Sequence, residues 1–196
     1  MMEQNEIRKK IKKTLDKERY EHTKGVMYTA GCLAMANRYP IEKAMLAGLL
    51  HDCAKCLSTA EKIRLCEDHH ILMTAVELEN PGLLHAKAGM ALAEEQYGVT
   101  DPDILHAIKV HTTGEPDMSI LDKIIYIADY IEPMRKEAPH LEEIREIAFH
   151  DLNQGVAEIL YDTLHYLNNR KGSIDPATQL TYEFYKQFGK EQPWKH

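Results

Sequence analysis

Cysteine is scarce in this sequence, and its few copies are irregularly spaced. The 196 residues include four cysteines, which are Cys32, Cys53, Cys56 and Cys66. Small secreted scaffolds that depend on disulfides carry denser and more regular cysteine patterns, so that class is excluded. Cys53 and Cys56 form a CxxC pair, but no second CxxC follows and no βαβ pattern surrounds it. We therefore expect reduced thiols, with the CxxC pair buried and chemically inert.

Long hydrophobic runs are also absent. A membrane-spanning helix needs about 20 consecutive apolar residues, and no segment of this chain approaches that length. The N-terminal stretch MMEQNEIRKKIKK is basic, but neither an apolar segment nor a small-residue cleavage site follows it, so we expect no secretory signal. These absences predict a soluble, cytoplasmic protein with no membrane partner.

Two functional classes are disfavoured by other missing features. A net charge of −7 argues against broad affinity for nucleic acid, which relies on Lys and Arg to neutralise phosphates. No GxxxxGK[ST] motif is present, which disfavours a P-loop enzyme. An anionic substrate would therefore need a locally positive site, and bound metal ions could provide one.

Helical periodicity runs through nearly every segment, and no alternating stretch is flanked by hairpin turns of the Asn-Gly type. The chain is also long enough to bury a core without disulfides, and its length fits one domain. The sequence therefore predicts an all-α helical bundle that forms a single domain over residues 1–196.

Local signals predict where the helices begin and end. Ser58 and Glu61 have the spacing of a capping box, so a helix should begin there. The helix before it should carry IEKAMLAGLLHD after Pro40 and place His51 and Asp52 near its end. Before these, a helix is expected over about Asn5 to Arg38, with a possible break near Gly25. Three more are expected over Leu83 to Tyr97, closed by Gly98, over Asp101 to near Gly114, and over Ile120 to Ile131, halted by Pro133. Leu141 to Asn169 should form one helix or two, and a last short helix should begin at Asp175 and Pro176.

The adjacent pair His51 and Asp52 follows the apolar stretch AGLL. An unpaired carboxylate in apolar surroundings is costly, and a bound divalent cation is one way to offset that cost. Helices of one bundle can direct further ligands to the same point, and the candidates on separate predicted helices are His22, His85, His111 and Asp129. Mixed nitrogen and oxygen ligands favour Fe, Mn, Co, Ni or Zn over Ca or Mg. The pattern predicts a transition-metal centre and leaves the metal open.

Asp129 lies inside the most apolar predicted helix, where a carboxylate that only faces solvent is unexpected. Asp122 lies on nearly the same face of that helix, so it is the second candidate, or else a structural partner or a helix cap. We expect the remaining histidines to have no role in the site; His106, for example, would point about 140° away from His111 on a regular helix. They are His69, His70, His106, His140, His150, His165 and His196.

The order of His22, the His51-Asp52 pair, His85, His111 and Asp129 resembles the H…HD…H…H…D signature of the HD phosphohydrolase superfamily. More narrowly, the segments RYEHTKGV, AGLLHDCAK and IIYIADYIEPMR look like the YqeK family, the symmetrical diadenosine tetraphosphate hydrolases of bacteria. The resemblance spans about Arg19 to Thr178. It implies an HD-type helical bundle and a dinucleoside polyphosphate or ADP as the small-molecule partner.

The resemblance also implies roles for particular residues. His22, His51, Asp52 and Asp129 match the ligands of a bound iron, and His85 and His111 match residues that face the phosphates or hold a second metal. One or two ions are therefore expected. The residues that would contact substrate are His22, Lys55, His85, His111, Arg135, Gly172, Ser173, Ile174, Asp175 and Thr178.

In the mechanism that these roles suggest, the metal activates a water for in-line attack on a phosphoryl group. Asp52, His85 and His111 are the expected catalytic residues, with Lys55 and Arg135 positioning the phosphate chain. Cleavage at the middle of diadenosine tetraphosphate would yield two ADP.

Other functions stay open at this point. The scaffold could serve another nucleotide phosphohydrolase, such as a nucleotidase or a cyclic-dinucleotide phosphodiesterase, although the GYP motif of the latter is absent. A non-enzymatic nucleotide sensor would keep the pocket without turnover, and a structural helical adaptor would bind no metal. The sequence also leaves open whether the chain forms a homodimer.

Overall fold

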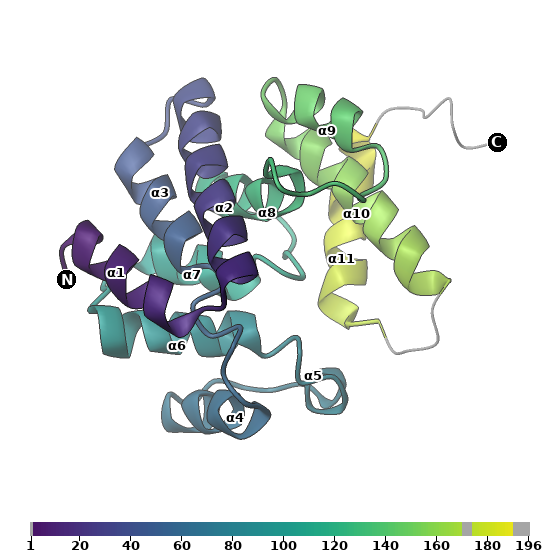
Figure 1. Cartoon of the computed structure of the whole chain (residues 1–196). Helices are drawn as coiled ribbons and strands as arrows, with labels where there is room; N and C mark the ends of the chain where they lie inside the picture. Colours follow the sequence, from purple (N-terminus) through teal and green to yellow (C-terminus); the bar gives the residue numbers. More distant parts are fainter. Residues whose placement is uncertain (1, 170–173, 190–196) are drawn as a thin grey trace.

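In the computed structural model of the chain, which describes residues 2–169 and 174–189, the regular elements are helical throughout (Figure 1). This confirms the predicted all-α fold. The elements are α1 (Gln4–Thr14), α2 (Lys17–Ala36), α3 (Ile41–Leu50), α4 (Thr59–Asp68), α5 (Ala75–Glu79), α6 (His85–Tyr97), α7 (Pro102–Val110), α8 (Ile120–Ile131), α9 (Leu141–Ala148), α10 (Leu152–Asn168), α11 (Pro176–Tyr185) and the short 3-10 helix η1 (Lys186–Phe188).

The first predicted helix is two helices, and the expected break near Gly25 is wrong. The chain is extended at Leu15 and Asp16, and the Asp16 carboxylate accepts a hydrogen bond of 2.8 Å from the backbone N–H of Arg19. Asp16 is thus the N-cap of α2, which satisfies a free amide at the helix start. Gly25 lies inside α2, where the buried side chain of Glu132 occupies the space that a Cβ would fill.

Most other predicted boundaries agree with the structure. The capping box of Ser58 and Glu61 begins α4, Gly98 ends α6 in the left-handed conformation, and Asp175 caps α11. The segment 141–169 divides into α9 and α10 because the Asp151 side chain caps a new helix. The short helix α5 was not predicted, although Thr74 and Glu77 form a capping box at its start.

Helix α8 is the centre of the molecule (Figure 1). Most of its side chains are buried, which agrees with the apolar sequence that predicted a central helix. Two groups of helices pack against α8. The first group contains α2, α3 and α7. The second contains α9 and α10, and α11 belongs to it because it packs against α10. Helices α4 and α5 lie together at one end of the first group. No helix among the described residues combines the length and apolar character needed to cross a bilayer.

Candidate metal centre

Four histidine side chains meet where α2, α3, α6 and α7 come together. His22 lies in α2, His51 follows α3 directly, His85 begins α6, and His111 follows α7 directly. The ring centroids are 5.4 Å apart for His22 and His51, 5.1 Å for His51 and His111, and 5.0 Å for His85 and His111. The structure therefore brings together imidazoles that the sequence separates by as many as 89 positions.

Three of these histidines are oriented by the same local contact. Nδ1 of His51 lies 2.7 Å from the carbonyl oxygen of Gly48, three residues earlier in the chain. His85 repeats the contact with Gly82 at 2.6 Å, and His111 with Ile108 at 2.7 Å. A carbonyl can only accept, so Nδ1 carries the proton and Nε2 presents a lone pair. The three rings therefore turn their metal-binding nitrogens toward the centre.

His22 is oriented instead by a carboxylate from the end of α8. Its Nδ1 lies 3.1 Å from Oε1 of Glu132, a residue that is only 2% exposed. The second carboxylate oxygen, Oε2, accepts a hydrogen bond of 2.6 Å from the backbone N–H of Met134. A carboxylate behind a metal-binding histidine fixes the ring and raises the basicity of the inward nitrogen.

Asp52 lies between the histidines and divides them into two pairs. Its Oδ2 lies 3.6 Å from Nε2 of His51 and 3.9 Å from Nε2 of His22. Its Oδ1 lies 3.2 Å from Nε2 of His85 and 3.7 Å from Nε2 of His111. One carboxylate thus faces two positions, and each position is lined by two imidazole nitrogens.

Asp129 completes the position beside His22 and His51. Its Oδ1 lies 3.0 Å from Nε2 of His22 and 3.9 Å from Nε2 of His51. One ligand atom each from His22, His51 and Asp129 lies within 4.8 Å of the others, and the same holds for His51, Asp52 and His111. Two nitrogens and two carboxylates are a donor set that suits a divalent transition metal.

Three of the donor atoms at the centre lack hydrogen-bond partners, which fits a metal site. Nε2 of His22, Nε2 of His51 and Oδ1 of Asp52 are buried without one in the described chain, although Asp129 and His85 lie within ion-pair distance. Buried polar atoms are normally paired, because leaving them unpaired is costly. A cation between them would satisfy these atoms, so the residues present fit a bound metal.

Burial and charge set the protonation of this cluster. Complete burial lowers the pKa of His51 to about 4, and burial also lowers the pKa of His85. Burial opposes ionisation of Asp52, but the surrounding imidazoles, beginning with His51, hold its pKa well below the usual range. Neutral imidazoles and ionised carboxylates are the protonation states that bind a metal.

His22 differs from its neighbours. Burial disfavours its charged form, but the carboxylates of Asp129 and Glu132 outweigh burial and raise the pKa of His22. The same contact acts on Asp129, where His22 and then His51 overcome the effect of burial and lower the pKa of the carboxyl group. A proton on His22 and a metal at Asp129 are therefore alternatives that compete for the same carboxylate.

Positive side chains surround the two positions. Nη1 of Arg19 lies 2.9 Å from Oδ2 of Asp52, and Nζ of Lys55 lies 3.0 Å from Nε2 of His85. Nη2 of Arg135 donates to the backbone carbonyl oxygen of Asp129 at 2.8 Å and lies 3.3 Å from its Oδ1. Cations at the edge of a metal centre are the arrangement that binding of a phosphate chain requires.

Comparison with known proteins agrees with this geometry. The family model described as HD domain matches residues 19–134, which include His22, the His51-Asp52 pair and Asp129. The chain belongs to the HD domain family. Most of its centre is therefore built within the matched segment, while α9, α10 and α11 lie outside it.

Relatives of this HD domain protein narrow the family further. The chain is 38% identical to the Bis(5'-nucleosyl)-tetraphosphatase, symmetrical, of Bacillus subtilis, over 89% of this chain and 92% of the relative. It is 40% identical to the protein of the same name from Halalkalibacterium halodurans, over 88% of this chain and 91% of the relative. These relatives confirm the expected membership of the YqeK family.

A solved structure matches the HD domain protein along nearly its whole length. It is a crystal structure from Clostridium acetobutylicum, described as a predicted HD superfamily hydrolase involved in NAD metabolism. The TM-score is 0.91 at 37% sequence identity, and the match covers 95% of this chain and 98% of the other. The fold of this HD domain protein therefore extends beyond the matched family segment to include the helices after α8.

Three residues near the centre of this HD domain protein were missed by the sequence analysis. Arg19 contacts Asp52, Glu132 contacts His22, and the hydroxyl of Thr112 lies 3.3 Å from Nε2 of both His85 and His111. Thr112 follows His111 directly, so its proximity could have been inferred. Glu132 is 110 residues from His22 and has no local signal that distinguishes it from a surface glutamate.

The predicted residues near the C-terminus are only partly described. Gly172 and Ser173 lie outside the described residues, and Ile174 is half-buried. Asp175 is buried and caps α11 through the backbone N–H of Ala177, and Thr178 is buried in the first turn.

Helix α11 packs against the turn that follows His111. Gly114 in that turn has a φ of +65°, and a Cβ there would lie 2.7 Å from Cγ2 of Thr181. This close approach holds α11 against the turn, three residues after His111.

The second candidate on α8, Asp122, lies away from the centre of the HD domain protein. Its Oδ2 accepts a hydrogen bond of 2.9 Å from the backbone N–H of Ser119 in a capping box, and its Oδ1 lies 3.0 Å from Nδ1 of His106. Ser119 is the N-cap of α8, and Asp122 is its structural partner in the capping box, a role that the sequence analysis held open as an alternative.

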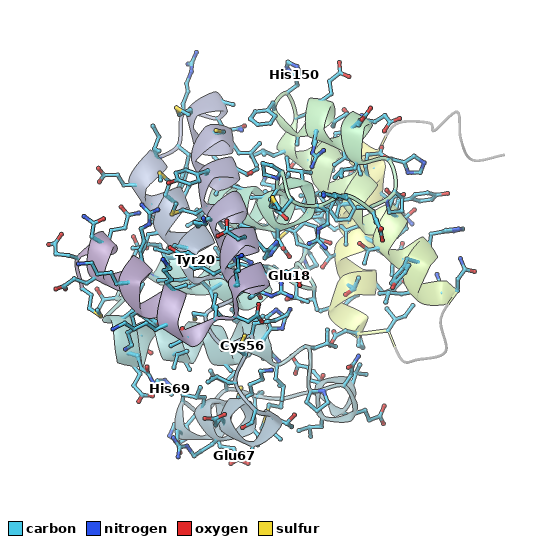
Figure 2. All side chains as sticks on the ribbon, in the orientation of Figure 1. Glu18, Tyr20, Cys56, Glu67, His69 and His150 are labelled. Carbon is cyan, nitrogen blue, oxygen red and sulfur yellow. The ribbon has the colours of Figure 1, made fainter. Side chains whose placement is uncertain are left out.

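The expectation for the CxxC pair is half wrong. Cys53 is buried, and burial raises the pKa of its thiol. Cys56 is exposed, and its Sγ lies 3.7 Å from Oδ2 of Asp16, near the start of α2 where Figure 2 labels it. Both thiols are free, so Cys53 and Cys56 form no disulfide with each other in this structure.

Proposed function

We propose that this chain is a metal-dependent phosphohydrolase that cleaves diadenosine tetraphosphate symmetrically into two ADP. The observation that carries the proposal is Asp52, whose two oxygens face two positions lined by histidine nitrogens. The names of the relatives from Bacillus subtilis and Halalkalibacterium halodurans support the choice of substrate.

The metal ligands in this proposal are His22, His51, Asp52 and Asp129, with His85 and His111 available to a second ion. We propose iron as the resident metal, and Mn, Co, Ni or Zn also suit the same nitrogen and oxygen donors. A divalent cation held here supplies positive charge that polarises a phosphoryl oxygen and acidifies water. The donor set supports this role because its carboxylates are ionised and His51 and His85 are neutral at pH 7.

The reaction breaks the bond between one central phosphorus atom and the central bridging oxygen. A water oxygen forms the new bond to that phosphorus, and the bridging oxygen leaves with the second ADP. His85 and His111 turn Nε2 atoms that are 3.1 Å apart toward the reacting group. Placed there, they receive a proton from the attacking water or stabilise charge on the transferred phosphoryl group.

Lys55 and Arg135 bind the phosphate chain in this proposal. Both lie at the edge of the centre, beside His85 and Asp129, and are partly exposed, so a ligand can reach them. Arginine presents a planar fork to two phosphate oxygens, whereas lysine offers a mobile point charge. His22, Ile174, Asp175 and Thr178 would contact one ADP half of the substrate.

Product analysis tests the proposal directly. The purified chain, loaded with Fe²⁺ or Mn²⁺, is incubated with diadenosine tetraphosphate, and the nucleotides are separated by chromatography. We expect ADP as the sole product. Appearance of ATP with AMP, or of inorganic phosphate, would contradict symmetrical cleavage.

Two matched variants complete the test. Asp52→Asn keeps the shape of the side chain but removes its charge, and we expect it to lose activity by at least 10³-fold, the order of a catalytic metal's contribution. Asp68→Asn makes the same change on a side chain that is 66% exposed on α4 and should retain full activity. Full activity in the Asp52→Asn protein would refute the mechanism.

A further inference from the structure

A cleft of about 770 Å³ opens between the start of α2 and the segment 132–138. Glu18, labelled in Figure 2, lies there on the side of α2 that faces the second group of helices. The inner wall of the cleft includes Arg19 and His22, so the cleft opens directly onto the metal centre. Its volume lies within the range of roughly 300–1,000 Å³ that pockets for ligands of this size have.

A second, smaller cavity also borders the centre. It has a volume of about 130 Å³ and runs from His111 and Thr112 to α10. Arg135 lines both hollows, and Asp129 lines only the smaller one. The smaller cavity lies toward the group of helices that carries Asp175 and Thr178, the residues expected to contact ADP. Of the predicted nucleotide contacts, His22 and Arg135 line the large cleft, whereas Asp175 and Thr178 do not.

The proposed reaction needs two nucleoside sites. Diadenosine tetraphosphate is cut at its midpoint, so the phosphate chain must extend in both directions from the metal centre, with a nucleoside at each end. The residues proposed so far to contact nucleotide would bind only one ADP half of the substrate. The other half carries the same charge and the same base, and it must leave as ADP after each turnover.

The side chains of the large cleft are arranged to suit that second half. Near the centre it has the guanidinium groups of Arg19 and Arg135, which suit phosphates. Farther out, Met134 is 56% exposed and offers an apolar surface for a base. Carboxylates of Glu18 and Glu137 also line the cleft, and these accept hydrogen bonds from ribose hydroxyls, as acidic residues do in dinucleotide sites.

We propose that this cleft binds the departing ADP half of the dinucleoside polyphosphate, with Met134 against its base. This inference rests on the proposed function. It assigns the segment 132–138 a role in selecting substrates with a nucleoside at both ends, in addition to the phosphate contact of Arg135.

One buried residue, Glu132, contacts both the cleft and the metal centre. The carboxylate of Glu132 lies 3.1 Å from Nδ1 of His22 and accepts the backbone N–H of Met134 at 2.6 Å. The position of Met134 relative to the centre is thus set by the same buried group that orients a metal ligand. A rigid connection of this kind is what a subsite needs, because small displacements of a bound substrate reduce rates steeply.

The test compares two substrates that have the same tetraphosphate chain. Diadenosine tetraphosphate has two nucleosides, whereas adenosine 5′-tetraphosphate has one, and cleavage at the middle of its chain would give ADP and pyrophosphate. The variant is Met134→Glu, and the control is Met35→Glu, because Met35 is 58% exposed on α2 but does not line the cleft. The conservative variant Met134→Leu keeps an apolar side chain at the same place.

We expect Met134→Glu to lower the ratio of kcat/KM for diadenosine tetraphosphate over that for adenosine 5′-tetraphosphate by at least tenfold, mainly through KM. Met35→Glu and Met134→Leu should keep the wild-type ratio within a factor of two. An unchanged ratio in Met134→Glu would overturn the inference, whatever the absolute rates. If wild-type protein releases no ADP from diadenosine tetraphosphate, the proposed function itself fails, which is a separate result from an unchanged ratio.

Discussion

Replacing Gly25 by alanine tests whether the contact of Glu132 with His22 shapes the metal centre. A Cβ at position 25 would lie 2.4 Å from Oε2 of Glu132 and 3.2 Å from its Cδ, so the carboxylate must move. It is buried and held from both sides, by Nδ1 of His22 and by the backbone N–H of Met134. Movement therefore breaks one or both of these contacts.

The magnitude follows from two opposing effects. Within a helix, a glycine-to-alanine change ordinarily stabilises by roughly 0.5–1 kcal/mol, because the unfolded chain loses conformational freedom. Disturbing the hydrogen bonds of a buried carboxylate costs roughly 1–3 kcal/mol. We expect Gly25→Ala to lower the free energy of unfolding by about 1 kcal/mol, and to weaken metal binding by roughly 10–100-fold as removal of supporting contacts does.

Gly31→Ala is the matched control on the same helix. A Cβ there would meet the side chain of Met45 at 3.0 Å, and Met45 is flexible and partly exposed, so it can move aside. We expect it to be neutral or stabilising and to leave metal affinity unchanged. Urea unfolding of the metal-free proteins and competition with a chelator of known affinity measure the two quantities. A Gly25→Ala protein that is more stable than wild type and binds metal equally well would refute the reasoning.

Three further predictions concern the ligands themselves. On α8, Asp129→Ala should abolish metal binding, whereas Asp122→Ala should retain the metal and lose about 1–2 kcal/mol of stability, because it removes half of the capping box with Ser119. Elemental analysis and urea unfolding separate the two variants, and equal metal content would contradict the assignment. The pKa of His51 is about 4 in the folded chain and 6.5 in the unfolded chain. Between these pH values the unfolded state binds more protons, so the free energy of unfolding falls as the pH is lowered. We expect the metal-free protein to lose about 2 kcal/mol from this group between pH 7.5 and pH 5, measured as the difference between wild-type and His51→Gln unfolding curves; parallel curves would count against it. A metal at 100 times its Kd should stabilise the wild type by about 2.7 kcal/mol, and thermal unfolding of Asp52→Asn should show no such gain.

Much of the fold could be predicted because its signals are local. The capping residues Ser58, Asp101 and Asp175 marked helix starts correctly, and the apolar run before Pro133 marked the central helix. The break at Asp16 has a comparable local signal, a capping aspartate. Glycine weakens helices in general, which favours a break near Gly25, but here its missing side chain makes room for Glu132.

The residues of the candidate site are also of two kinds, those with a local sequence signal and those without one. His51, Asp52 and Asp129 could be found because polar groups in apolar helices need partners, and the order of the histidines then resembled a known signature. Arg19 and Glu132 could not, because their roles depend on contacts across 33 and 110 residues. Nothing in their own neighbourhoods distinguishes them from the many other charged residues of a chain that is 28% charged.

The placement of Asp52 between two pairs of histidines has a consequence for counting ions. Because each of its oxygens faces a different pair, any substitution at this residue perturbs both positions at once. The number of equivalents bound must therefore come from residues that belong to one pair only. Loss of one equivalent in a His85 variant, with the other retained, would reveal a binuclear centre that substitution of the shared carboxylate conceals.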